Sequence, residues 1–141
     1  IVIHAIILLV GAHYTYAHVP LGFWMQDVFD FSRNHYDRIG HIAQGFIPAI
    51  LARELFIRHK VVAANGWRPF LVVCFCLAFS AFYELIEWWS AVFAGDGSVE
   101  FLGTQGDIWD AQWDMFMALL GAITAQLTLY RLHNRQLARL S

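Results

Sequence analysis

Four long apolar segments limit what this chain can fold into more than any other feature of its sequence. They cover residues 1–17, 39–57, 70–94 and roughly 111–130. A helix needs about 20 mainly apolar residues to cross the hydrocarbon core of a bilayer, and its backbone groups must be hydrogen-bonded within the protein because lipid offers no partners. The sequence therefore predicts an all-α integral membrane protein with a bundle of four transmembrane helices.

The composition favours a single multi-pass membrane domain over residues 1–141. Only 14% of the residues are charged and 59% are hydrophobic, whereas soluble domains carry about 25% charged residues. The expected partner is the lipid bilayer, and the formal net charge of −2 gives no reason to expect nucleic acid. Cys74 and Cys76 lie two positions apart in an apolar segment, so on a helix they point in different directions and pack rather than form a disulfide.

The start of the chain is unusual, because Ile1 already lies inside an apolar segment and no basic stretch precedes it. Such a start is unlike a signal peptide. We therefore expect the sequence to be a piece of a longer protein with further helices upstream.

Lysine and arginine residues predict the orientation, because cytoplasmic loops are enriched in them. With four spans, the 58–69 loop and the C-terminal tail fall on one side, with six basic residues: Arg58, Lys60, Arg68, Arg131, Arg135 and Arg139. The 18–38 and 95–110 loops fall on the other side, with two basic residues, Arg33 and Arg38, and with acidic residues that include Asp96 and Glu100. The sequence predicts that the 58–69 loop and the C-terminus are cytoplasmic.

Ionisable side chains gather near the opposite, periplasmic ends of the predicted helices. They form three groups, each spaced to share one helix face: Asp37 with His41, Glu84 with Glu87, and Asp107 with Asp110 and Asp114. A charge at the bilayer centre costs about 3 kcal/mol on insertion scales, so these groups are expected to face the bundle interior. There they repel one another unless they are protonated, paired or bound to a metal.

A set of carboxylates with an imidazole suits Zn, Mn, Fe or Mg better than copper or an iron–sulfur cluster. The candidate cofactor is therefore a divalent metal. Its candidate ligands are His41, Glu84, Glu87, Asp107, Asp110 and Asp114. The candidate catalytic residues, as ligands or general bases, are Asp37, His41, Glu84 and Glu87.

Each of these residues also has a purely structural interpretation. Asp107 and Asp110 can stabilise the start of the last helix as a cap and a first-turn acid. Asp37 can pair with Arg38, His41 can be a hydrogen-bonded packing residue, and Glu84 can bond across helices. The joint prediction of a polar site rests on all of them lying at one depth.

Three stretches of the sequence resemble the YjdF family of bacterial inner-membrane proteins: "RNHYDRIGHIAQGFIPAILARE", "SAFYELIEWW" and "FLGTQGDIWDAQWDMFMALLGA". The similarity covers nearly the whole chain and implies a multi-pass protein of the bacterial inner membrane. Members usually carry further hydrophobic sequence upstream. The chain is also similar to VanZ-like proteins, where Asp37 and His41, a Glu at 84 or 87, and an Asp at 107 or 110 match the pattern; this implies a role with envelope lipids or glycans.

Three classes of function fit these features. The first is an enzyme or binding site at the periplasmic leaflet that acts on a lipid head group or a lipid-linked envelope substrate, with a metal that activates water or polarises oxygen. The second is a structural or assembly protein whose polar layer locks the helices together. The third is a component of a proton- or cation-coupled transporter.

Overall fold

The computed structural model describes residues 1–63, 66–94 and 104–139. These residues form five α-helices and no strand: α1 (Val2–His13), α2 (Pro20–Phe29), α3 (Tyr36–Arg58), α4 (Trp67–Ala94) and α5 (Asp110–Ala138). The all-α prediction is confirmed for this part of the chain.

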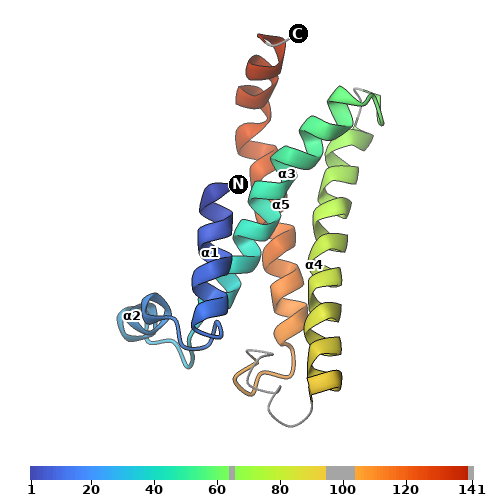
Figure 1. Cartoon of the computed structure of the whole chain (residues 1–141). Coiled ribbons are helices and arrows are strands. Elements are labelled where there is room, and N and C mark those ends of the chain that lie inside the picture. Colours follow the sequence, from blue (N-terminus) through green and yellow to red (C-terminus); the bar gives the residue numbers. More distant parts are fainter. Residues whose placement is uncertain (64–65, 95–103, 140–141) are drawn as a thin grey trace.

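Helices α3, α4 and α5 form an elongated bundle, and α1 lies alongside α3 (Figure 1). Helix α3 contacts each of the other three and packs most extensively against α5. Small residues make this packing close: a methyl group added at Gly45 would overlap the backbone carbonyl of Ala118, and one at Gly121 would overlap the carbonyl of Ile42. The α3–α5 interface is therefore a backbone-to-backbone contact, as small residues allow in membrane helices.

Two helices, α4 over Trp67–Phe93 and α5 over Asp110–Ala138, are both long and apolar enough to cross a membrane. Helix α3 has 23 residues but carries more polar side chains. Helix α1 has 12 residues, or about 18 Å at 1.5 Å per residue, which is less than the hydrocarbon thickness. Two of the four predicted spans, α4 and α5, therefore meet the criterion for a membrane-spanning helix, and the predicted bundle of four is not confirmed.

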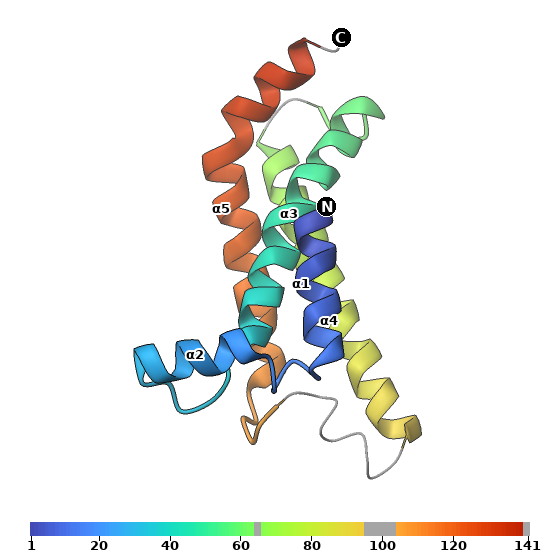
Figure 2. The ribbon, with the colours of Figure 1, turned by 60° about the vertical axis from the view of Figure 1, so that its left-hand side comes forward.

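The 18–38 segment, expected to be a loop, contains helix α2. Its first residue is Pro20, a position where the missing N–H costs nothing, and Asp30 ends it in the left-handed conformation with φ 53°. Helix α2 projects sideways from one end of the bundle (Figure 2) and exposes large apolar side chains, among them Leu21, Trp24 and Phe29. Most of the expected 95–110 loop, with Asp96 and Glu100, lies outside the described residues.

Candidate functional site

One end of the bundle, at the bottom of Figure 1, brings together the starts of α3 and α5 and the last turns of α4. The segments leading into α3 and α5 are joined by Asn34 and Gln105. The Asn34 N–H donates to Gln105 Oε1 at 3.2 Å, and Gln105 Nε2 donates to the Asn34 carbonyl at 2.8 Å. The Asn34 side chain also donates to the Val19 carbonyl and accepts from the Tyr36 N–H. These bonds fix where α3 begins relative to α2 and α5.

Two arginines and two aspartates form an ion-pair network at this end. Arg33 Nη2 lies 2.5 Å from Asp110 Oδ1 and 3.3 Å from Asp107 Oδ2. Arg38 Nη2 lies 3.0 Å from Asp107 Oδ2 and 3.7 Å from Asp110 Oδ1. The hydrogen bond from the Trp109 N–H, with help from the two arginines, holds the pKa of the Asp107 carboxyl below its usual range. Asp107 and Asp110 therefore each lie beside two guanidinium groups.

A second cluster lies around His41, whose side chain is almost fully buried. His41 Nε2 lies 3.5 Å from Glu84 Oε1 of α4 and 3.6 Å from Asp37 Oδ1 on its own helix. The other ring nitrogen, Nδ1, lies 3.4 Å from Ser80 Oγ. The geometric expectation that His41 faces the interior near a carboxylate from another helix is confirmed.

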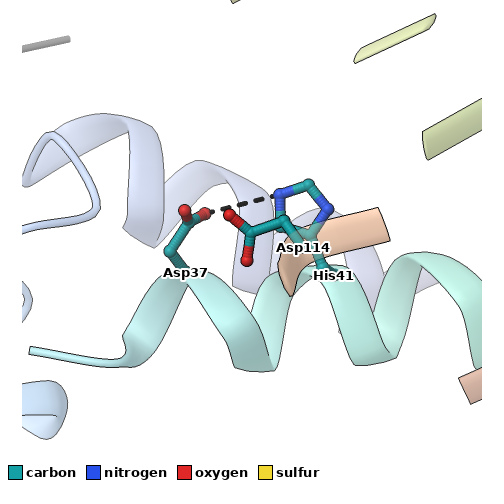
Figure 3. Close-up of side chains that lie close together, drawn as sticks. All are labelled: Asp37, His41 and Asp114. Carbon is teal, nitrogen blue, oxygen red and sulfur yellow. Dashed lines mark ion pairs between the residues drawn. The ribbon is translucent and has the colours of Figure 1, made fainter. Parts of the chain in front are cut away.

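Asp114 of α5 completes this cluster. Its side chain points toward Asp37 and His41 of α3 (Figure 3), and one ligand atom from each of the three residues lies within 4.8 Å of the others. Asp114 is 1% exposed, and its Oδ1 has no hydrogen-bond partner. Glu84 Oε1 is likewise buried without one. We call Asp37, His41, Glu84 and Asp114 the carboxylate–histidine cluster.

The cluster contains three carboxyl groups and only one imidazole that could carry a positive charge. Among the described residues, no arginine or lysine forms an ion pair with its three carboxylates, since Arg33 and Arg38 pair with Asp107 and Asp110. Carboxylates held this close repel unless a proton or a cation lies between them. Zn–O and Zn–N bonds of about 2.0–2.2 Å put the ligand atoms of a tetrahedral site roughly 3.4 Å apart. The ligand atoms of Asp37, His41 and Asp114 lie within 4.8 Å of one another, so modest side-chain movements would bring these three residues around one ion.

The predicted site residues fall into two separate groups in the structure. Asp37, His41, Glu84 and Asp114 come together, whereas Asp107 and Asp110 belong to the arginine network. Asp107 precedes α5 and does not share a helix face with Asp114. Glu87 is half-buried one turn beyond Glu84.

Sequence reasoning missed two contributors to the site. Ser80 lies one turn before Glu84 on α4, and this i, i+4 spacing was a usable signal. Gln105 had no such signal, because its role depends on where the loop before α5 meets Asn34.

A hollow of about 710 Å³ opens beside the arginine network, between α2, α3 and α5. The charged or titratable residues of its lining are Arg33, His35, Arg38 and Asp107, and Ser32 and Gln105 add neutral polar groups. Its apolar part consists of Met25, Phe31, Ile39, Ile42, Trp113 and Met117. Arg38 stacks over the Trp113 ring at 5.3 Å, and burial together with the two arginines lowers the pKa of His35. A charged rim over an apolar wall suits an amphiphilic molecule with a polar head group.

Two apolar helices long enough to span a bilayer, with ionisable side chains buried at one end of the bundle, are typical of α-helical membrane proteins. The chain belongs to the family described as "Predicted membrane protein (DUF2238)", which matches residues 1–135.

A curated relative extends this result. The chain is 55% identical over 139 residues to "Inner membrane protein YjdF" of Escherichia coli (strain K12). The match covers 99% of the chain and 66% of the relative, so the chain spans about two-thirds of that protein's length. The resemblance to the YjdF family is confirmed. No solved structure matches the chain.

Proposed function

We propose that the chain is a multi-pass domain of the bacterial inner membrane that holds a divalent cation in the carboxylate–histidine cluster and presents it to the head group of an envelope lipid or lipid-linked substrate. The location is supported by the name of the 55% identical relative. The single observation that carries the cation site is Asp114, a fully buried carboxylate that lies beside Asp37 and His41 and has one oxygen, Oδ1, without a hydrogen-bond partner among the described residues.

The proposal includes α3 as a third span. Its 23 residues extend over about 34 Å, enough for the hydrocarbon core, and contacts with α1, α4 and α5 shelter it from lipid. Its polar residues His41 and Gln44 are buried against protein. Helix α1, which the sequence predicted as the fourth span, packs on α3.

His41 is arranged as a metal ligand. If Nδ1 carries the proton and donates to Ser80 Oγ, the Nε2 lone pair faces Glu84 and Asp37. Ligating histidines commonly donate their other N–H to a neighbouring acceptor in this way. A bound divalent ion would supply Lewis acidity toward a phosphoryl or carbonyl oxygen. Asp37 or Glu84 then remains as a base beside it.

The hollow supports the choice of a lipid-like substrate. The hollow lies at the same end of the bundle as the carboxylate–histidine cluster. The two sites are neighbours in the sequence, because Arg38 lines the hollow and Asp37 belongs to the cluster. Guanidinium groups recognise phosphate and carboxylate oxygens, and the apolar wall fits a chain in the outer leaflet.

A structural role is the second candidate, favoured by the contacts that His41 makes to Ser80 and Glu84 of α4. On this view the polar layer locks helices together without binding an ion.

Metal analysis of the purified protein separates these candidates. We expect a divalent metal close to one per chain in the parent, with loss of that metal in Asp114→Asn. The matched control is Asp30→Asn, an exposed position in the left-handed conformation that asparagine tolerates. No metal above background in the parent between pH 6 and 8, or equal metal in Asp114→Asn, would favour the structural role.

A further inference from the structure

A second cavity lies at the other end of the bundle, well away from the carboxylate–histidine cluster. It measures about 430 Å³ and is bordered by Arg53 of α3, Arg68 of α4, and Gln126, Leu127, Tyr130 and Asn134 of α5. This is the upper end in Figure 1, where α3 ends and α4 begins. Nothing in the proposed function uses these residues.

Two guanidinium groups border the cavity, and neither is paired with an anion from the part of the chain that the structure describes. Arg53 is 6% exposed and donates to two neutral partners, His133 Nδ1 at 2.7 Å and Asn134 Oδ1 at 2.5 Å. Arg68 donates to the Val62 carbonyl at 3.2 Å. Within the described residues, no carboxylate lies within ion-pair distance of either arginine. Burying an uncompensated charge is costly, so this end of the bundle favours an added anion.

The nearest carboxylate in sequence is already engaged. Glu54 Oε1 accepts from Arg58 Nε at 2.7 Å, and its Oε2 lies 3.7 Å from His133 Nε2. Because His133 Nδ1 accepts from Arg53, its Nε2 carries the proton and faces Glu54. Glu54 is therefore turned toward Arg58 and His133.

Two further donors at the cavity lack acceptors. Gln126 Nε2 and Arg68 Nε are buried without a hydrogen-bond partner among the described residues, and Gln126 is 8% exposed as a residue. Buried donors in proteins are nearly always satisfied. With the two guanidinium groups, they form a set of N–H donors around one space, which is the arrangement that an oxyanion requires.

The cavity also has an apolar, outward-facing border. Leu127 is 72% exposed and Tyr130 is 39% exposed, and both line the cavity. Arg53 lies five residues before the end of α3, or about 7–8 Å along the axis. That depth matches the boundary between acyl chains and head groups, where a lipid phosphate lies.

We propose that this cavity binds the phosphate of an anionic phospholipid, with Arg53, Arg68 and Gln126 as donors and the acyl chains along Leu127. Anionic lipids bind basic pockets between membrane helices in this manner. The positively charged loops place this end at the cytoplasmic leaflet, although the binding chemistry does not depend on orientation.

The test measures thermal unfolding of the full chain in detergent while one ligand is titrated at a time. The ligands are phosphatidylglycerol, phosphatidylcholine and inorganic phosphate. We expect a saturable rise in the unfolding temperature with phosphatidylglycerol, and little change with the other two. An equal response to phosphatidylcholine would overturn the proposal, and so would a full response to inorganic phosphate alone, which would assign the site to free phosphate.

Variants show whether the response arises at this cavity. Arg68→Gln removes a charge-assisted donor, so we expect about tenfold weaker binding of phosphatidylglycerol. Arg135→Gln is the matched control, because Arg135 is exposed on α5 and does not border the cavity. Equal weakening in both variants would show a non-specific surface effect and would overturn the proposal.

A further variant is expected to gain stability, so its result does not depend on a damaged fold. Gln126→Glu keeps the side-chain shape and supplies an anion beside the two arginines. We expect a higher unfolding temperature without lipid and a loss of the phosphatidylglycerol response. Retained lipid binding with no gain in stability would contradict the assignment.

Discussion

The side chains at the polar end of the bundle differ in whether their charges are matched. Asp107 and Asp110 each lie within reach of two guanidinium groups. Asp37, Glu84 and Asp114 lie beside the His41 ring and have no arginine or lysine partner among the described residues. Carboxylates that are paired with arginines in this way have a structural role. Unmatched buried carboxylates need a proton or a cation, and that need makes the cluster the candidate for chemistry.

Glu84 and Glu87 provide a residue-scale prediction, because only Glu84 reaches His41 in the described structure. Glu84→Gln removes an anionic oxygen from the cluster, so we expect bound metal to be lost while thermal stability stays equal or rises, as burying a charge is costly. Glu87→Gln should retain the metal. Metal content and unfolding temperature of both purified variants check this; metal loss in Glu87→Gln alone would show that the ion is held elsewhere.

Arg33 provides a second prediction at this scale. Its guanidinium is 12% exposed and lies 2.5 Å from Asp110, which is buried. Arg33→Gln leaves Asp110 without its closest cation, so we expect a loss of about 3 kcal/mol in the free energy of unfolding, measured by chemical unfolding in mixed micelles.

The double variant Arg33→Gln with Asp110→Asn should recover part of that loss, because the unpaired charge is gone. Arg139→Gln, an exposed position near the C-terminus, is the control and should change stability little. A double variant no more stable than Arg33→Gln would show that the pair does not act through charge.

Among the helices, α3, α4 and α5 were predictable from the sequence, because long apolar runs mark them. Helix α2 was not, since its 10 residues are too few to register as a span, although Pro20 and the apolar residues after it are typical of a helix start. Sequence patterns also predicted only part of the site. Spacing along one helix placed Asp37 with His41, but the partners from α4 and α5 depend on how the helices cross.

The α3–α5 contact yields a prediction at the element scale. A methyl group at Gly45 would overlap the Ala118 carbonyl, which belongs to the backbone and cannot rotate away. Gly45→Ala should therefore separate the two helices and cost about 1–3 kcal/mol, and it should weaken metal binding because Asp114 and His41 lie on these helices. Gly66→Ala is the control, since nothing lies within 4 Å of its added methyl group. Unchanged unfolding and metal content in Gly45→Ala would contradict the close packing.

Across the whole molecule, the two ends of the bundle differ in chemistry. One end holds the carboxylates of α4 and α5 and the start of α3. The other has Glu54 as the single carboxylate of the described residues there, together with Arg53, Arg58, Arg68 and the basic residues at the end of α5. Such asymmetry is what the positive-inside rule describes, so the distribution of charge along the bundle supports the proposed orientation, with the cluster at the periplasmic leaflet.

Cysteine labelling tests this orientation. Ile108 is 83% exposed just before α5, and His59 is exposed just after α3, so cysteines placed there report the two ends. In a background with Cys74→Ala and Cys76→Ala, a membrane-impermeant thiol reagent should label Ile108→Cys in intact spheroplasts. It should label His59→Cys only after the membrane is permeabilised, because basic loops stay in the cytoplasm. The reverse pattern would move the carboxylate–histidine cluster to the cytoplasmic leaflet and exclude a substrate from the outer one, whereas labelling of both sites in intact spheroplasts would contradict an odd number of spans between them.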